Sequence, residues 1–565
     1  MPHVLTGTPH TSWSLPTPIT LLSLILLLQM IQPTISVPLL QFDASQAVLE
    51  AYIDAHTLDG TSTVSQSVKS NQKPNTVDPT SHRPLPHPKP VGLPVSNPTK
   101  SFWTHGSPDA NPLAREGSQG ELTPEADVCI IGSGITGVSA LWHLVDGLGA
   151  NSSGRAVDID TAGNRNQKKV VVLEARDFCS GATGRNGGHL TPFIFFDFSR
   201  REQLYGTSEA LKSYELENYT SKKLVGLLNN TGDHDDADLV NGGHITLFLT
   251  DQEERIARKD FEAAKAAGLS GLDKVVWIDK DEMNQTKGTP FPGVQIPGHN
   301  LWPLKLVTKM FKLAEKKAKD AGVDIKLHTH TPVTGITPTG SQPESSSSRR
   351  FELSTPRGPI KCSYIIHATN GYANHLLSPG KTGIVVVPTR GQIIGTRAAA
   401  GEKAVGKTSW DANEGFEYWF PRPVKEEDEK KPLIILGGGR EVSAPNYELY
   451  ETNDAEVNHT VGSRLKKFLP GLFPGMFPEE SEPEWEWTGI TGFTKTGDPF
   501  VGPVYENGVK LEGQYVSAGY TGHGMPRGYA CAEAVAGMII ADLKGEQWVQ
   551  PEWLPDRYLT KPRNS

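Results

Sequence analysis

Cysteine is scarce in this sequence, with only four residues in 565: Cys129, Cys179, Cys362 and Cys531. No two of them form a CxxC pair, and no cysteine and histidine spacing matches a zinc site. The chain therefore shows no metal site and no disulfide framework of the kind that holds small secreted domains together. We interpret the cysteines as buried structural thiols, since free cysteine is among the most buried residue types.

Positive charge is also in short supply. Lysine and arginine total 55 against 64 aspartate and glutamate, which gives a net charge of −9. Nucleic-acid-binding surfaces are usually basic, so we expect no nucleic-acid partner. Hydrophobic residues make up 37% and charged residues 21%, as in ordinary globular enzymes. The length predicts three or four domains of roughly 150 residues each.

Long hydrophobic runs are limited to residues 18–31 (PITLLSLILLLQMI). This run is short for a membrane span, which needs about 20 residues, and resembles the core of a signal peptide. No lysine or arginine precedes it, so the usual positive flank is missing. We treat residues 1–37 as a possible signal peptide or anchor, and expect membrane contact only if they are retained. Cytoplasmic and secretory or extracellular locations both stay open.

Residues 38–100 are rich in serine, threonine and proline, and we expect a disordered linker there. A strand-like run, 127–131, then leads into Gly132-Ser-Gly-Ile-Thr-Gly137 and a helical pattern that continues through Leu148. A strand, a glycine-rich turn and a helix in this order are typical of dinucleotide binding. The glycines allow the tight turn and the close approach of a pyrophosphate, which the N-terminus of the helix attracts.

A second apolar strand, 170–175, carries Glu174, which could bind the ribose hydroxyls of an adenosine. Glu174 follows Gly137 by 37 residues rather than the usual distance of about 20. The polar stretch 150–169 accounts for the excess as a surface insertion, because long surface loops cost little stability. Residues 179–188 (CSGATGRNGG) follow at once, and their four glycines suit close packing against an extended ligand.

With these motifs, the chain resembles the D-amino-acid oxidase-like family of FAD-dependent oxidoreductases. The family includes sarcosine oxidase, glycine oxidase and γ-glutamylputrescine oxidase, and the resemblance is closest to the γ-glutamylputrescine oxidase-like members of fungi. It covers about 101–545. It rests on five blocks: DVCIIGSGITG, VVLEARDFCSGATGRNGGH, HATNGY, WTGITGFTKTGDPFVGP and YVSAGYTGHGMPRGYACAEAVAGMI.

The resemblance implies an α/β fold, α+β overall, in which a Rossmann-like FAD-binding domain is interleaved with an antiparallel-sheet substrate domain. The expected FAD-binding parts are 101–190, 301–383 and 488–548. The expected substrate-domain parts are 191–300 and 384–487, and 549–565 form a tail.

The resemblance also implies a set of cofactor-binding residues, several of them through backbone groups. FAD should be noncovalent, because no cysteine lies near the WTGITGFT block. The C-terminal turn should offer N–H groups to the N1–C2 carbonyl edge of the flavin. The expected set is Gly132, Gly134, Ile135, Thr136, Gly137, Glu174, Ala175, Gly181, Ala182, Thr183, Arg185, Asn186, Gly187, Gly188, Val333, Gly371, Gly519, Thr521, Gly522, His523, Gly524 and Met525.

The expected substrate and catalytic residues are fewer: His523, Arg440, Tyr418 and Trp419. His523 lies in the flavin-facing turn. Tyr418 and Trp419 belong to an aromatic segment (SWDANEGFEYWF) that could bind an alkylammonium by cation–π contact, although each ring singly is better explained as core packing. Arg440 could grip a carboxylate, and a surface ion pair explains it equally well.

The resemblance implies that the chain removes a hydride from a carbon next to an amine nitrogen, with a small-molecule amine and O2 as partners. Three alternatives stay open: a dehydrogenase that passes electrons to a quinone or flavoprotein, a flavin-binding protein without turnover, and an NAD-dependent enzyme. The last is disfavoured, because the GHG block has no role in a simple nicotinamide domain.

Overall fold

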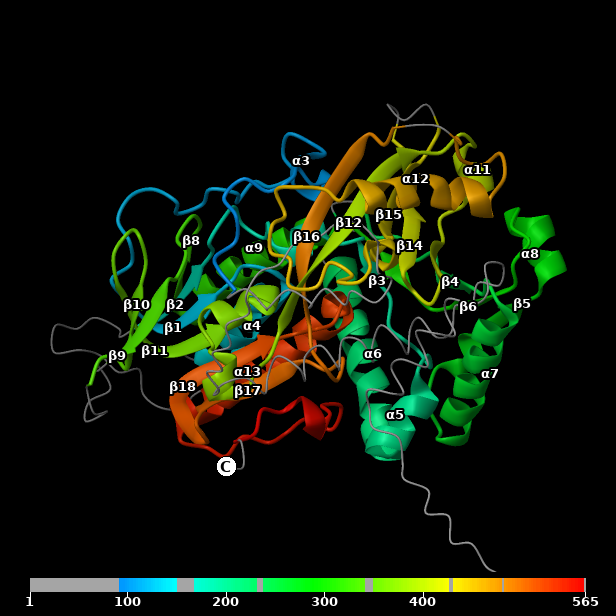
Figure 1. Cartoon of the computed structure of the whole chain (residues 1–565). Coiled ribbons are helices and arrows are strands. Elements are labelled where there is room, and N and C mark those ends of the chain that lie inside the picture. Colours follow the sequence, from blue (N-terminus) through cyan, green and yellow to red (C-terminus); the bar gives the residue numbers. More distant parts are fainter. Residues whose placement is uncertain are drawn as a thin grey trace, which may run out of the picture. The chain divides into compact units, whose positions relative to one another are not determined.

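The computed structural model describes residues 91–149, 167–230, 237–340, 349–425, 430–479 and 482–562 (Figure 1). All of them fall in one compact unit, Gln46–Ser565. The expected leader, most of the expected linker and most of the 150–169 insertion lie outside the described residues. No helix of the described residues is long and apolar enough to cross a membrane.

The first sheet has eight strands and is mostly parallel at its centre, in the order β17-β18-β11-β1-β2-β8, with β10 and β9 branching from β11. Parallel pairing joins β18, β11, β1, β2 and β8. The strands are β1 (Glu125–Ile131), β2 (Lys168–Leu173), β8 (Val323–His328), β9 (Gly335–Pro338), β10 (Phe351–Ser354), β11 (Ile360–His367), β17 (Phe500–Glu506) and β18 (Val509–Ala518).

The second sheet also has eight strands, in the order β16-β12-β15-β14-β13-β4-β6-β5. It is antiparallel except where β13 pairs with β4 in parallel. The strands are β4 (His244–Leu247), β5 (Val276–Ile278), β6 (Gly293–Ile296), β12 (Val387–Arg397), β13 (Ser409–Ala412), β14 (Glu417–Pro421), β15 (Leu433–Gly438) and β16 (Trp485–Phe493). A small sheet pairs β3 (His189–Leu190) with β7 (His299–Asn300).

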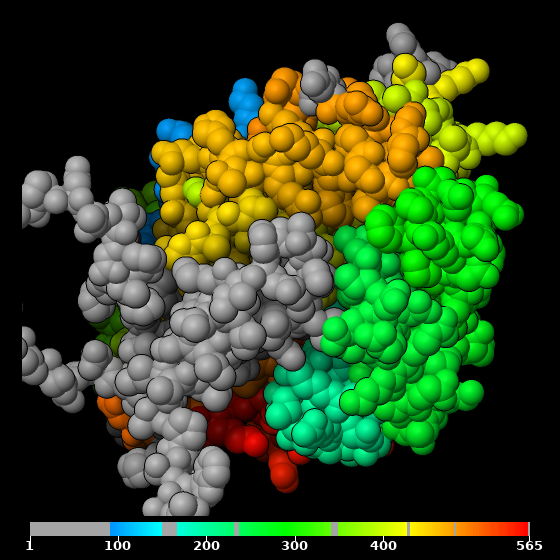
Figure 2. Space-filling view, turned by 45° about the vertical axis from the view of Figure 1, so that its right-hand side comes forward, coloured from blue at the N-terminus to red at the C-terminus, as the bar shows by residue number. Residues whose placement is uncertain are grey.

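Helices cover both sheets, and α4, α9 and α13 pack against the first one, where the two core helices α4 and α13 lie against each other (Figure 1). Among the outer helices, α12 covers the second sheet (Figure 1). In Figure 2 the green segment, which includes α7 and α8, lies beside the yellow and orange one. The helices are α3 (Phe102–His105), α4 (Ile135–Leu148), α5 (Phe198–Tyr205), α6 (Thr207–Asn230), α7 (Asp251–Ala266), α8 (Lys280–Lys287), α9 (Pro303–Ala321), α10 (Pro379–Thr382), α11 (Glu402–Val405), α12 (His459–Leu472) and α13 (Gly524–Lys544).

The predicted fold class is confirmed: a partly parallel α/β unit is interleaved with a largely antiparallel sheet. Strands β1, β2, β8–β11, β17 and β18 alternate along the chain with those of the second sheet. One element, β16, spans the expected boundary between 487 and 488 and belongs to the second sheet.

The cysteine interpretation was wrong for one pair. Cys129 of β1 and Cys362 of β11 form a disulfide with a Cα–Cα distance of 6.0 Å. The two strands are parallel neighbours, and this brings residues 233 positions apart within reach. Cys179 and Cys531 are buried free thiols, as expected.

Candidate active site

The glycine-rich turn between β1 and α4 is closed so tightly that side chains cannot fit. Gly132 has φ +110°, and a Cβ there would lie 2.5 Å from the carbonyl oxygen of Ala368. A Cβ on Gly137 would lie 1.9 Å from the carbonyl oxygen of Gly132. Gly134 caps α4, which begins with Ile135 and Thr136. The turn therefore lies at the N-terminus of α4, whose positive end favours an anion.

Glu174 is held beside this turn. The backbone N–H and the hydroxyl of Ser133 donate to its Oε2 (3.1 and 2.7 Å), and the N–H of Arg176 donates to Oε1 (3.0 Å). Ala175 lies between Glu174 and Arg176 at the end of β2. Val333 is buried close by, just after Thr331, whose N–H donates to the carbonyl of Glu174. The carboxylate thus lies where a ribose bound to this turn would meet it.

The loop that follows β2 closes on the same helix. The hydroxyl of Thr183 accepts a hydrogen bond from the N–H of Ile135 (3.0 Å), at the start of the 3₁₀ turn Ala182–Arg185. A Cβ on Gly181 would meet no atom within 4 Å, so this part of the loop borders open space. Asn186 caps the loop by accepting from the N–H of Gly188 (2.8 Å).

Arg185 was expected beside the cofactor, but protein groups engage its guanidinium. It donates to the carbonyl of Thr488 (2.6 Å) and to Thr99, and it lies 3.4 Å from Asp454. Burial lowers the pKa of Arg185 to about 10, although Asp454 opposes this shift. The side chain therefore ties the loop to β16, and the indole N–H of Trp487 donates to the backbone carbonyl of Arg185 (2.9 Å).

The C-terminal turn is built from residues with positive φ: Gly519 (+85°), Thr521 (+51°) and Gly522 (+82°). The side chain of Asn370 accepts from the N–H of Gly519 (3.0 Å), and the N–H of Thr521 donates to the carbonyl of Gly492 (2.8 Å). A Cβ on Gly522 would meet no atom within 4 Å, so this turn also faces open space.

His523 caps α13, and Gly524 and Met525 form the first helical positions. Gly371 packs under β16, where a Cβ would lie 2.6 Å from the carbonyl oxygen of Thr491. The turn therefore directs the positive end of a 21-residue helix toward the space in front of it.

A buried ion pair supports this turn from behind. Nε of Arg527 donates to Oε1 of Glu217 (2.7 Å), and both side chains are 1% exposed. The N–H of Phe193 donates to Oε2 of the same carboxylate (2.8 Å). The ring of His523 stacks on Phe193 at 3.7 Å, with its Nδ1 3.6 Å from Glu217. Burial lowers the pKa of His523, and Glu217 opposes the shift.

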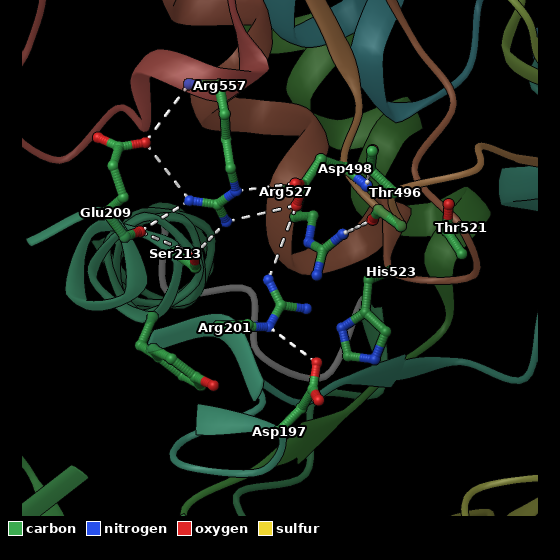
Figure 3. Close-up of polar contacts among 12 residues, drawn as sticks. Asp197, Arg201, Glu209, Ser213, Thr496, Asp498, Thr521, His523, Arg527 and Arg557 are labelled. Atoms are coloured by element: carbon green, nitrogen blue, oxygen red, sulfur yellow. Dashed lines mark hydrogen bonds and ion pairs between the residues drawn. The ribbon is translucent and has the colours of Figure 1, made fainter. Parts of the chain in front are cut away.

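A neighbouring polar cluster, around Arg557 and Asp498, anchors the C-terminal segment (Figure 3). Arg557 donates to Asp498 (2.8 Å), to the carbonyl of Glu209 (2.7 Å) and to Ser213. Figure 3 shows Arg201 between Asp197 and Asp498, with His523 on the neighbouring turn. Segments far apart in the sequence thus fix the geometry of the His523 turn.

The second sheet meets the cofactor loop through Tyr418. A Cβ on Gly187 would lie 2.3 Å from the Tyr418 ring, and one on Gly188 would lie 2.8 Å from Phe420. Trp419 points the other way, because successive side chains of a strand alternate between faces. It is 2% exposed and packs with Trp410 in the core under α12. The assignment of Trp419 as a substrate residue is therefore corrected.

Arg440 follows β15 after Gly438 and Gly439. Its guanidinium lies 5.3 Å from the centre of the Phe416 ring and 5.0 Å from that of Phe493. Among the described residues no hydrogen bond or ion pair engages this guanidinium. Burial lowers its pKa, while Glu441 and Tyr418 oppose the shift. The alternative of a surface ion pair does not hold.

Comparison with known proteins decides the family. The model of the DAO family, described as FAD dependent oxidoreductase, matches residues 127–538. The chain belongs to this family. FAD is accordingly its cofactor, and the prediction of an FAD-dependent enzyme resembling amine and amino-acid oxidases is confirmed.

Individual relatives are distant. The chain is 23% identical to probable oxidoreductase OrdL of Rhizobium meliloti over 421 residues, 74% of this chain and 83% of the relative. It is equally similar, over 435 residues and with the same coverage, to gamma-glutamylputrescine oxidoreductase of Escherichia coli. Glycine oxidase from Geobacillus kaustophilus has the same fold, with a TM-score of 0.54 and 19% identity over 78% of this chain and all of that one.

The residues of this flavoenzyme fit FAD. The glycine turn and the N-terminus of α4 would hold the pyrophosphate, and Glu174 would hold the adenosine ribose. One glycine of the cofactor loop, Gly181, and one of the C-terminal turn, Gly522, border open space, which would leave room for an extended ligand at both. The individual contacts of the expected cofactor residues remain predictions.

Sequence analysis missed two polar residues on the sheet face that carries Tyr418. Asp411 of β13 lies directly opposite Tyr418. Nε2 of His244, on β4, lies 3.4 Å from Oδ1 of Asp411. The ring of His189 lies 5.5 Å from that of Tyr418 and 5.7 Å from that of His244. No local motif marks Asp411 or His244, because strand pairing alone brings them together.

Proposed function

We propose that this flavoenzyme oxidises the CH–NH bond of a small amine that carries an anionic group, with O2 as electron acceptor. The observation that carries the proposal is the guanidinium of Arg440, which no acidic side chain of the described residues pairs with, close to Tyr418 on the side of the second sheet that covers the cofactor loop. The names of its relatives, a gamma-glutamylputrescine oxidoreductase and a glycine oxidase, support an amine or amino acid as substrate.

The Arg440 guanidinium is half-buried and lies beside aromatic rings, where an anionic ligand would find a charged donor. Its planar fork matches a carboxylate, which it can hold by two parallel hydrogen bonds. Phe416 and Phe493 flank it and restrict its rotation. Tyr418 stays a neutral donor, because burial raises its pKa to about 12. Together these groups would fix one end of the substrate.

When bound, FAD supplies the two-electron oxidant that accepts a hydride. The chain supplies position and electrostatics. Arg440 and Tyr418 hold the substrate, and the aromatic rings around them exclude water. The N-terminus of α13 favours negative charge in front of the His523 turn. Glu217 and Arg527 keep that turn in place.

The first test is a visible absorption spectrum of the purified protein, before and after anaerobic addition of amines with and without a carboxylate. A flavin spectrum bleached by a carboxylate-bearing amine is the expected result. An oxygen electrode then measures whether reoxidation consumes O2 and releases peroxide. A flavin that no amine bleaches would refute the proposal, and reoxidation by quinones alone would replace O2 as acceptor.

Arg440→Lys tests the anion site directly. Loss of the two-pronged contact should raise KM for a carboxylate-bearing amine roughly 10- to 100-fold, the equivalent of about 1.5–3 kcal/mol, with little change for an amine without one. The matched control is Arg397→Lys, which alters an arginine paired with Glu484 at the surface end of β12. Equal effects on both substrates would show that Arg440 serves structure rather than recognition.

A further inference from the structure

Asp411 lies in the middle of the candidate site. In the register of the second sheet it is directly opposite Tyr418 on one side and Thr246 on the other. Residues opposite each other across paired strands point to the same face of a sheet. Because Tyr418 contacts the cofactor loop at Gly187, the Asp411 carboxylate belongs to the face that covers this loop.

Three polar atoms around Asp411 have no hydrogen-bond partner among the described residues. They are Oδ1 of Asp411, Oγ1 of Thr246 and Nε2 of His189, and all three are buried. Buried polar atoms in folded proteins nearly always have partners, so this cluster suits a ligand that forms hydrogen bonds. Asp411 and His189 also interact electrostatically, and this places the unpartnered atoms in one cluster.

The cluster is suited to a ligand that donates hydrogen bonds. The Asp411 carboxylate is charged and only accepts. Carbonyl groups of Gly187 and Trp410 lie near the His189 ring, and only the contact of Nδ1 with Gly187 (3.2 Å) has hydrogen-bond geometry. Nδ1 therefore carries the proton and Nε2 accepts. Burial lowers the pKa of His189 to about 4, so the ring stays neutral. An ammonium group, with three donors and a positive charge, satisfies both a carboxylate and a neutral imidazole.

His244 offers a ring nitrogen, Nε2, that can accept one proton. The Ser409 hydroxyl donates to the carbonyl of Gly243 (3.1 Å), so its oxygen accepts from Nδ1 of His244 (3.0 Å). With the proton on Nδ1, Nε2 of His244 turns a lone pair toward Oδ1 of Asp411, 3.4 Å away. Two acceptors at this distance repel each other, and one added proton converts the repulsion into an ion pair.

We propose that Asp411 and His244 bind the substrate's ammonium group and take up its proton. This inference rests on the proposed amine oxidation and deepens it, since only the neutral amine has the lone pair that assists loss of hydride from the neighbouring carbon. In the step, an N–H bond of the ammonium breaks and an Nε2–H bond of His244 forms. Asp411 remains an anion beside the imidazolium, and the substrate is left as the neutral amine.

The charged and titratable groups that face the pair are His189 from β3 and Tyr418 from β14. Burial would raise the pKa of Asp411, but the neighbouring His244, Thr246 and His189 outweigh burial and lower the pKa. Asp411 is thus ionised at neutral pH and can attract a cation.

The test compares Asp411→Asn and His244→Gln with the wild type in anaerobic stopped-flow reduction of the bound flavin, from about pH 6 to about pH 10. Both variants should reduce the flavin at least about 100-fold more slowly at neutral pH. The difference in reduction rate between the wild type and each variant should shrink by about tenfold for each unit by which the pH rises, because the variants depend on amine that is already neutral in solution. The control is Asp324→Asn on β8, whose side chain is 26% exposed, as is that of Asp411.

A second measurement does not need turnover. An analogue of the active amine without hydrogen on its α-carbon should bind Asp411→Asn at least about tenfold more weakly than the wild type or Asp324→Asn at neutral pH, as expected for loss of a charged hydrogen bond. Flavin content and melting temperature verify that each variant folds, and His244→Gln serves if Asp411→Asn does not.

The outcomes separate the two proposals. If no amine bleaches the wild-type flavin, amine oxidation and this inference fall together. If amines bleach it and the Asp411 and His244 variants keep the wild-type pH profile and affinity, amine oxidation stands and the inference is overturned. A deficit that stays constant with pH would make these residues structural, and this too overturns the proton transfer.

Discussion

Replacing Glu217 by glutamine should destabilise the protein strongly, because it removes one half of a buried ion pair. Glutamine has the same size but no charge. Arg527, 1% exposed, would keep only carbonyl partners, those of Gly497 (2.9 Å) and Tyr520 (3.5 Å). Removal of one partner from such a pair costs about 3–5 kcal/mol, since the other charge stays buried and uncompensated.

The pKa of Glu217 gives a second route to the magnitude. Burial alone would raise this pKa, but the charges of Arg527 and His523 outweigh it and lower the value from 4.5 to about 2. That difference corresponds to roughly 3 kcal/mol of stability in the ionised form, at about 1.4 kcal/mol per tenfold change. A lowered carboxyl pKa stabilises the protein above 4.5, and the contribution is lost as the pH falls through about 2.

Thermal unfolding of wild type and Glu217→Gln at neutral pH and at about pH 3 measures both effects. A loss of about 3–5 kcal/mol in a chain of this length lowers the melting temperature by roughly 3–4 °C. The difference should shrink to roughly half or less by about pH 3. Glu209→Gln, on the same helix but 20% exposed, is the matched control and should change little. A Glu217 variant as stable as the wild type, or a difference independent of pH, would refute the reasoning.

Two further predictions concern other buried groups. Burial and the neighbouring Glu441 raise the pKa of Glu417 to about 8. Because the folded protein holds this proton more tightly than the unfolded one, the proton stabilises the fold fully below pH 4.5, and this contribution is lost as the pH rises through 8. Glu417→Gln should therefore gain stability over the wild type from about pH 5 upward and level off above 8, and denaturant titrations that show a constant difference would contradict this. Alkylation of the unreduced, denatured protein should label Cys179 and Cys531 but not Cys129 or Cys362, and mass spectrometry detects the linked peptide. That result would favour an oxidising compartment over the cytoplasm, whereas four labelled thiols would remove this support.

The cofactor half of the site could be predicted from sequence because its contacts are close along the chain. Ser133 and Glu174, which hydrogen-bond beside the turn, are 41 residues apart, and Ile135 and Thr183 are 48 apart. Steric limits also leave a signature there, since Gly132 and Gly137 have no space for a side chain. A strand, a turn and a helix in sequence order then fix most of the geometry.

The substrate half could not be predicted in the same way. Tyr418 and Trp419 are adjacent in sequence and equally suited to an amine, but they point to opposite faces of β14. Which face covers the cofactor loop depends on α12, whose side chains fill the other face. The sequence carries no local sign of that packing, so a choice between neighbouring aromatic residues needs the tertiary structure.

Long-range pairing also explains why other features were missed. The disulfide joins strands that are parallel neighbours, offset so that Cys129 faces Ile365 and Cys362 faces Ala126. Glu217 and Arg527 are 310 residues apart, and the helix that carries Glu217, α6, buries polar residues such as Thr220 and Ser221 among its apolar ones. Cysteine spacing and apolar periodicity are signals along the chain, and neither reports a partner so distant.

The cofactor half and the substrate half of the site lie on different sheets. The groups that would hold the pyrophosphate and ribose lie on the first sheet, whereas Tyr418, Asp411, His244 and Arg440 lie on or beside the second. Asp411 and His244 come from strands β13 and β4, whose outward-facing neighbours Trp410 and Ile245 secure the sheet in the α12 core. Polar residues on the inner face can therefore be exchanged without disturbing either the sheet or the cofactor turn. On the proposed function, the residues on this face should govern which amine is bound while FAD binding stays the same.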